Sequence, residues 1–345
     1  MAPSPVPVAL DALSRRGCDF LGSDYAIMGG AMTWVSERNL VAAISNGGGF
    51  GVLACGAMGP DLLDREIAAV KARTGRPFGV NLIILHPELD RLVEVCVDHR
   101  VGHVVLAGGL PGAAVIGAVK AGGARVLCLA STLGVARRLV RQGADAIIIE
   151  GMEAGGHIGP VSTGVLAQEI LPHMREVPVF VAGGIGRGEG AAAYLRMGAS
   201  GCQLGTRFVC ASESIAHPDF KRAFIRANAR DAQVTVQVDP DFPVIPVRAL
   251  ANRATQHFVE TQHRVIADFR EGRLDRKAAQ LEIEHFWTGA LRRAVVDGDV
   301  EEGSLMAGQS VGLVRREQPV AEILAELVGQ AAASLAGEQW EDASR

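Results

Sequence analysis

The sequence has few aromatic residues, no strong charge of one sign and no long hydrophobic run. Aromatic residues make up 5% of the 345 residues and the formal net charge is -4, so we expect no nucleic-acid partner. No apolar stretch approaches the roughly 18 residues that span a bilayer, so no membrane partner is expected. The apolar run at residues 6–10 is short, and basic residues follow it instead of preceding it, so no secretory signal is predicted.

The six cysteines form no C-x-x-C pair, and several lie inside apolar runs. This usage is typical of reduced, buried thiols, so we expect a cytoplasmic protein without disulfides. The histidines have no metal-ligand spacing with one another, and no metal is expected.

Short apolar runs alternate with longer helical patterns from residue 25 to about residue 228. The run Ala146-Ile147-Ile148-Ile149 is continuous, as expected for a strand that is buried on both faces. Eight such repeats favour an α/β fold, a closed parallel TIM (βα)8 barrel, and leave an open doubly wound sheet as the alternative. The expected strands lie at residues 26–28, 50–54, 78–84, 103–106, 125–129, 146–149, 179–182 and 202–208.

The strand–helix alternation stops after Asn228. We therefore expect a barrel at residues 20–228 and an inserted helical subdomain at residues 229–300, with helices at residues 249–269 and 276–294. Residues 301–336 are expected to return to the barrel and to end in a helix.

A glycine-rich loop follows the sixth expected strand. It runs Glu150-Gly-Met-Glu-Ala-Gly155-Gly156-His157-Ile-Gly. Glycines let the backbone approach a planar ligand closely. Imidazole is the side chain best suited to proton transfer near neutral pH, so His157 is the candidate catalytic residue.

Glycines also follow the seventh and eighth expected strands, in Ala182-Gly183-Gly184 and Gln203-Leu204-Gly205-Thr206. In barrels of this class a phosphate is often bound after these two strands. Backbone N–H groups and the Thr206 hydroxyl suit a phosphate monoester, although the glycines could serve only to make tight turns. Read from Gly186, the glycines meet only the relaxed form of the dinucleotide fingerprint, which ends in Ala191. Because they follow a seventh strand and not a first one, no dinucleotide site is expected here.

Asn81, Gly30 and Met32 are further candidates near strand ends. A carboxamide can donate to and accept from the imide edge of a heterocycle, and methionine with glycine offers a flat apolar surface. A loop cap for Asn81 and core packing for Met32 are the alternatives.

Several motifs in one order resemble the flavin-dependent nitronate monooxygenase superfamily. They are Pro77-Phe-Gly-Val-Asn81, the loop from Glu150 to Gly159, Ala182-Gly-Gly-Ile185, Gly188-Glu-Gly-Ala-Ala-Ala193 and Gly205-Thr-Arg-Phe208. The run at residues 294–314, with Met306-Ala-Gly-Gln309, is similar to the type II, FMN-dependent enoyl-[acyl-carrier-protein] reductase branch. At Ala31 the chain departs from the usual pattern, in which a Gln and two glycines precede the Met.

The resemblance implies a TIM barrel with non-covalently bound FMN that passes hydride from NADH or NADPH to an enoyl thioester, either a small molecule or one on an acyl carrier protein. It implies nitronate oxidation, quinone reduction or flavin binding without turnover as alternatives, and a homodimer is a candidate assembly. His157 would be catalytic. The cofactor-binding residues would be Gly30, Ala31, Met32, Asn81, Glu150, Gly155, Gly156, Ala182, Gly183, Gly184, Gln203, Gly205 and Thr206.

Overall fold

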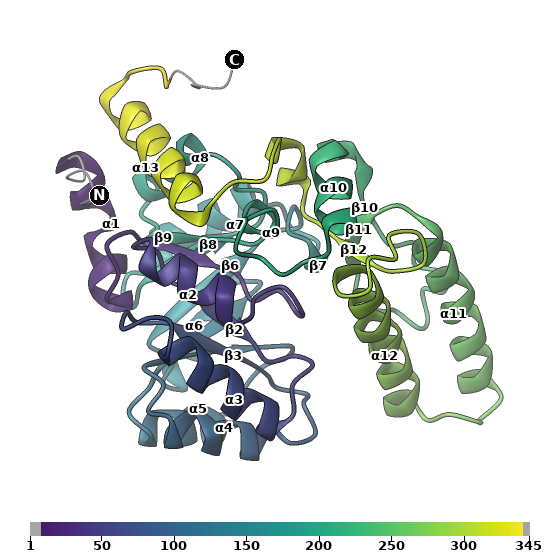
Figure 1. The fold of residues 1–345 in the computed structure, drawn as a ribbon. Coiled ribbons are helices and arrows are strands. Elements are labelled where there is room, and N and C mark those ends of the chain that lie inside the picture. Colours follow the sequence, from purple (N-terminus) through teal and green to yellow (C-terminus); the bar gives the residue numbers. More distant parts are fainter. Residues whose placement is uncertain (1–7, 341–345) are drawn as a thin grey trace.

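A parallel eight-stranded barrel forms the centre of the molecule (Figure 1). The structure is a computed structural model that describes residues 8–340. The barrel strands are β1 (Ile27–Gly29), β2 (Val52–Ala54), β3 (Gly79–Ile83), β4 (His103–Ala107), β5 (Arg125–Ala130), β6 (Ala146–Glu150), β8 (Val179–Ala182) and β9 (Gly201–Leu204).

Contacts between the first and the last strand of the sheet close it into a barrel. Hydrogen bonding links them in the order β1-β9-β8-β6-β5-β4-β3-β2. A parallel bridge between Met28 and Phe50 then joins β1 to the start of β2, with hydrogen bonds from Gly29 N to Phe50 O and from Phe50 N to Ile27 O, both at 2.9 Å. This closure confirms the barrel and rejects the open sheet.

One strand ends earlier than its sequence predicted. The eighth barrel strand stops at Leu204, and residues after Gly205 form a short helix, α9 (Thr206–Val209). The apolar residues of this helix, including Phe208, are fully buried, which is why the run resembled a continued strand.

Both faces of the barrel strands are buried, which explains their continuous apolar sequence. Ile148 and Phe180 belong to the core inside the barrel, whereas Ile147 and Ile149 pack outward against the surrounding helices. Alternate side chains of one strand therefore fill two different cores.

The barrel is surrounded by helices, as the alternation predicted. They are α1 (Val8–Leu21), α2 (Arg38–Asn46), α3 (Pro60–Lys71), α4 (Leu89–Asp98), α5 (Ala113–Ala121), α6 (Leu133–Arg141), α7 (Thr163–Ile170) with η1 (Leu171–His173), α8 (Gly188–Arg196), α10 (Pro218–Arg226) and α13 (Val320–Ala336). The last of these, α13, packs against α8 and also contacts α1 and α2.

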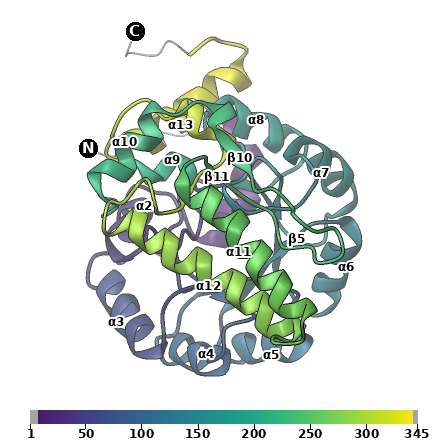
Figure 2. The same ribbon diagram turned by 90° about the vertical axis from the view of Figure 1, so that its right-hand side faces the viewer.

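The segment between α10 and α13 contains strands as well as helices. Its elements are η2 (Ala229–Asp231), β10 (Ala232–Val234), β11 (Val247–Leu250), α11 (Arg253–Arg270), α12 (Arg276–Val295), β12 (Leu305–Met306) and η3 (Gln309–Leu313). We call α11 and α12 the helical hairpin; they cross in front of the barrel (Figure 2) and pack around Phe258 and Trp287.

Helix α11 begins at Arg253 and not at residue 249 as predicted. The preceding residues pair with β10 and β12, and Asn252 then caps the helix by accepting a hydrogen bond from Thr255 N. Pairing between distant strands thus determines where this helix starts. None of the helices in residues 8–340 is long and apolar enough to cross a membrane.

Two glycines in α8 provide a test of how tightly α8 and α13 pack. A Cβ on Gly188 would lie 1.9 Å from Leu327 O, whereas a Cβ on Gly190 would meet nothing within 4 Å. We expect Gly188→Ala to lower the free energy of unfolding by about 3 kcal/mol or more, because α13 must move. Gly190→Ala should be neutral or stabilising by up to about 1 kcal/mol. Urea denaturation of both variants measures the difference, and equal values would contradict this packing.

Candidate active site

His157 lies on a two-residue strand at the end of the glycine-rich loop. This strand, β7 (Gly156–His157), pairs antiparallel with β11, so that His157 lies opposite Val247 and Gly156 opposite Arg248. The hydrogen bond from Ile158 N to Pro246 O, at 3.0 Å, extends the pairing. The imidazole is 42% exposed, and its Nε2 lies 3.3 Å from Oε2 of Glu284 on α12. The histidine is therefore held between the barrel loop and the helical hairpin.

The loop before His157 is in backbone contact with residues 301–336, which we call the C-terminal segment. A Cβ on Gly155 would lie 2.6 Å from Gly308 N, and a Cβ on Gly308 would lie 2.7 Å from Glu153 O. Gln309 N donates to Glu153 O at 2.9 Å, and Gly308 N donates to Thr206 Oγ1 at 2.9 Å. Residues 306–309 thus connect the loops that follow β6 and β9.

The loops after β8 and β9 present backbone donors at the candidate phosphate site. Gly183 and Gly184 have φ of +96° and +74°, a conformation that favours glycine. Within residues 8–340, no hydrogen bond uses the N–H groups of Gly183, Gly184, Gly205 or Thr206. Four unused donors from two adjacent loops are what a bound phosphate requires.

The loop after β1 lies beside the loop after β9. Gly30 N donates to Leu204 O at 2.8 Å, and a Cβ on Gly30 would lie 3.6 Å from Cγ of Gln203. A Cβ on Gly205 would lie 3.5 Å from Sδ of Met32. These contacts bring the candidate residues Gly30 and Met32 together with Gln203 and Gly205. Ala31, which precedes Met32, packs against the core inside the barrel.

Asn81 lies inside strand β3 and is not a loop cap. Its Nδ2 donates to Val105 O at 3.1 Å, and the residue is 5% exposed. The bond orients the carboxamide and leaves its oxygen able to accept. Ala182 pairs with both Glu150 and Gln203 across β6, β8 and β9, so these three residues are neighbours at the ends of their strands.

Glu150, the last residue of β6, has the most perturbed carboxyl group in the site. Removal from solvent raises its pKa from 4.5 to about 7, and the nearby His157 opposes this rise. The group can therefore carry or release a proton near neutral pH. It stands beside the loop that carries His157.

Sequence reasoning missed three residues that hold this loop in place. Arg248 of β11 is 4% exposed, and its Nε donates to Met152 O at 2.9 Å. The carboxylate of Glu153 accepts from Thr163 N and Oγ1, both at 2.8 Å. Glu284 contacts His157 from the hairpin. An arginine within the apolar stretch Val247-Arg-Ala-Leu250 was the one visible signal, because buried arginines need acceptors.

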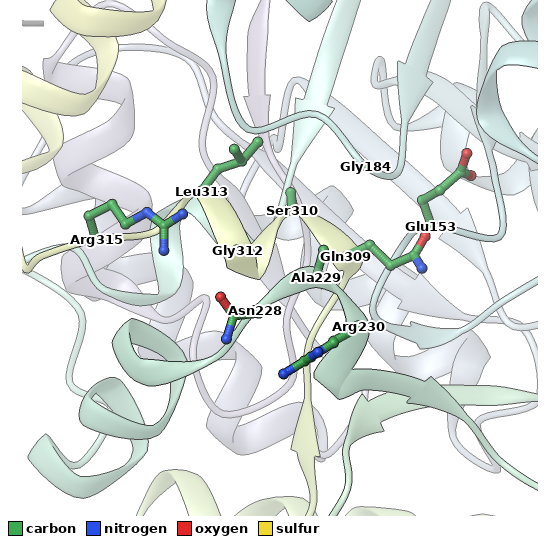
Figure 3. A pocket seen from close by; sticks show the side chains of 10 residues that line it. All are labelled: Glu153, Gly184, Asn228, Ala229, Arg230, Gln309, Ser310, Gly312, Leu313 and Arg315. Carbon is green, nitrogen blue, oxygen red and sulfur yellow. The ribbon is translucent and has the colours of Figure 1, made fainter.

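A pocket of about 670 Å³ borders the candidate phosphate site (Figure 3). Gly184 is shared between the two, and the other lining residues come from the loop after β6, from η2 and its N-cap residue, and from the C-terminal segment. They are Glu153, Asn228, Ala229, Arg230, Gln309, Ser310, Gly312, Leu313 and Arg315. In the part of the chain that the structure describes, no group of three or more His, Cys, Asp or Glu side chains could hold a metal ion.

Comparison with known proteins identifies the relatives of this chain. The nitronate monooxygenase family model matches residues 15–92 and 86–330. The chain is 32% identical to a Mycobacterium tuberculosis (3aS,4S,5R,7aS)-5-hydroxy-7a-methyl-1-oxo-octahydro-1H-indene-4-carboxyl-CoA dehydrogenase, over 90% of this chain and 94% of that protein. It is 30% identical to a nitronate monooxygenase of Paraburkholderia phytofirmans, over 89% and 92% of the two chains.

A solved structure agrees with these relatives. FabK from Thermotoga maritima superimposes with a TM-score of 0.83 at 37% identity, over 93% of this chain and 97% of that one. The fold and the relatives together define an oxidoreductase built on a TIM barrel. The chain belongs to the nitronate monooxygenase family.

The raised pKa of Glu150 predicts a pH-dependent stability. The folded state binds this proton more tightly than the unfolded state, so the free energy of unfolding falls as the pH rises from about 4.5 through about 7. Glu150→Gln should remove this slope and make the protein more stable than wild type at pH 8 by about 2–3 kcal/mol. Urea denaturation at pH 5 and pH 8 measures it. A wild-type stability that rises over this interval relative to the variant would contradict the assignment.

Proposed function

We propose that the protein is an FMN-dependent oxidoreductase that uses NADH or NADPH to reduce the double bond of an enoyl thioester. The observation that carries this proposal is the position of the segment with Met306-Ala-Gly-Gln309, whose sequence resembles the reductase branch. It contacts Gly155 and Thr206, two of the candidate cofactor residues. A relative that acts on a CoA thioester and a structural neighbour named FabK support the same class of substrate.

The donors and surfaces of the site fit FMN. The four unused N–H groups of Gly183, Gly184, Gly205 and Thr206 would bind its phosphate. Met32 and Gly30 would lie against the ring, and the oxygen of Asn81 would accept from its imide edge. Bound FMN would supply hydride transfer, which no side chain of the protein can perform.

His157 would assist the protonation that accompanies hydride addition. When hydride reaches the β-carbon of an enoyl thioester, negative charge develops on the thioester oxygen and the α-carbon, where a proton must be added. The imidazole can stabilise this charge with a hydrogen bond or donate the proton. Glu284, at 3.3 Å from Nε2, would orient the ring.

Nitronate oxidation is the second candidate. The family model and the Paraburkholderia phytofirmans relative both carry that name, and a histidine beside a carboxylate would also serve as a base. To separate the two functions, the protein is reduced anaerobically with NADH or NADPH and then mixed with crotonyl-CoA or a quinone. In a parallel experiment the oxidised protein is mixed with an alkyl nitronate, which would donate electrons, in the presence of oxygen. Fast reoxidation by crotonyl-CoA alone supports the reductase, whereas turnover with the nitronate and oxygen alone would overturn it.

The purified protein should be yellow and should release FMN, not FAD, on heating. The loops after β8 and β9 form the candidate cradle for the flavin phosphate, and the sequence has no dinucleotide fingerprint after a first strand. Chromatography of the released flavin checks this. A colourless protein that does not bind added FMN would end the proposal.

Thr206→Val should weaken FMN binding by about 1.5–3 kcal/mol, because it removes a hydroxyl that can donate to the phosphate. It also removes the acceptor for Gly308 N, so part of the loss would come from the C-terminal segment. Thr206→Ser, which keeps the hydroxyl, is the matched control. Fluorescence titration of the flavin-free proteins with FMN compares the three, and equal affinities would place the phosphate elsewhere.

His157→Ala should slow reoxidation by crotonyl-CoA by about 100- to 10,000-fold, the usual contribution of a positioned acid–base group. Flavin content and reduction by NADH or NADPH should change much less, because hydride donation to the flavin needs no proton from His157. His157→Gln should recover part of the rate if hydrogen bonding is what matters.

The matched control for this experiment is His257→Ala. His257 is also an exposed histidine beside a glutamate, with 3.0 Å between its Nδ1 and Oε2 of Glu302, but it is on α11. Stopped-flow measurement of the two half-reactions decides the question. If His157→Ala reoxidises as fast as His257→Ala, His157 has a structural role.

A further inference from the structure

The pocket beside Gly184 has the chemistry of an anion site. Arg230 and Arg315 both line it and both are exposed. The nearest carboxylate oxygen to Arg230 is that of Asp231, 3.9 Å from Nε, and this carboxylate already accepts a hydrogen bond from Asn228 N at 2.7 Å. In residues 8–340, no ion pair involves Arg315. Two guanidinium groups are therefore available to a ligand.

The acidic residue of the pocket does not neutralise these arginines. The Glu153 carboxylate accepts two hydrogen bonds from Thr163. Arg315 and Glu153 lie at opposite ends of the pocket, with Ser310 and Gln309 between them (Figure 3). The side chains of these two middle residues form no hydrogen bond within the described residues, so a hydroxyl and a carboxamide are also free to bind.

The size and the apolar part of the pocket indicate more than a single phosphate. Its volume of about 670 Å³ lies within the usual range for small-molecule sites. Leu313 is 41% exposed there, although leucine is more often buried, and its side chain lies against Gly186, where an added Cβ would be 2.7 Å from Leu313 Cδ1. An exposed apolar side chain and two guanidinium groups that line one pocket suit an adenosine that carries phosphates.

We propose that this pocket binds the phosphorylated adenosine diphosphate end of a co-substrate. That chemical group is common to NADPH, with a 2′-phosphate, and to coenzyme A, with a 3′-phosphate. The identity of the ligand rests on the proposed function, since a nicotinamide reductase of thioesters uses one or both of these molecules. The pocket adjoins Gly184 of the candidate FMN phosphate site, so the ligand would extend outward from the flavin.

The test uses the flavin-loaded protein and two fragments that contain no reactive group, 2′,5′-ADP and 3′,5′-ADP. Isothermal titration measures their dissociation constants for wild type, Arg230→Gln, Arg315→Gln and the control Arg316→Gln. Arg316 is exposed and adjacent to Arg315 but does not line the pocket. We expect each of the first two variants to weaken binding by about 10-fold, and the control to stay within about 2-fold of wild type.

Which fragment binds identifies the source of the group. Binding of 2′,5′-ADP alone assigns the pocket to the hydride donor, and binding of 3′,5′-ADP alone assigns it to a CoA thioester; binding of both supports a shared site. Binding of neither, or an equal effect of Arg316→Gln, overturns the proposal. So does loss of FMN from Arg230→Gln or Arg315→Gln, which would make the pocket part of the flavin site. Because no turnover is measured, a protein that reduces crotonyl-CoA but binds neither fragment refutes this inference alone.

Discussion

The candidate site depends on the antiparallel pairing of β7 with β11. Strand β7 belongs to a barrel loop, and β11 belongs to the segment that carries the helical hairpin, so this pairing joins the two. Arg248 strengthens the junction, since one buried guanidinium donates to Met152 O in the loop and, at 2.5 Å, to Ala232 O in β10. Without it, His157 would be on a mobile glycine loop, and Glu284 would have no fixed partner. Catalytic precision of a few tenths of an ångström needs such support.

The glycines of the site fall into two groups with different physical causes. Gly155 and Gly308 are required by the protein itself, because a Cβ at either position would collide with backbone atoms. Gly30 and Gly205 are not: neither has a positive φ, and a Cβ there would make ordinary contacts at 3.5 Å. Packing therefore does not explain why these two positions lack side chains. The proposed ligand would need this space, which favours the cofactor over the tight-turn alternative at Gly205, whereas Gly183 and Gly184 have the positive φ that a tight turn requires.

The barrel could be predicted from the sequence because each of its strands is indicated by residues that are close together in the chain. The run Ile147-Ile148-Ile149 alone shows a strand buried on both faces, and the glycine motifs mark where strands end. The prediction was wrong where strands that are distant in the sequence pair. Residues 249 and 250 have a helical pattern but belong to β11, because their backbone groups pair with β10 and β12. The contact between Glu284 and His157 joins residues far apart in the sequence, and no spacing rule could reveal it. The division into subdomains remains a prediction.

Glu150 lowers the free energy of unfolding at and above neutral pH. A carboxyl group whose pKa is raised to about 7 by removal from solvent opposes folding at and above neutral pH, and the interaction with His157 only partly counteracts this rise in the pKa. At the end of a buried strand, an apolar residue or a carboxamide would give a more stable barrel. Natural proteins keep such groups where activity needs them, at the expense of stability. Glu150 lies beside Ala182 and near His157, between the candidate cofactor cradle and the candidate proton donor. We infer that activity, and not stability, is the reason for a carboxyl group at this position.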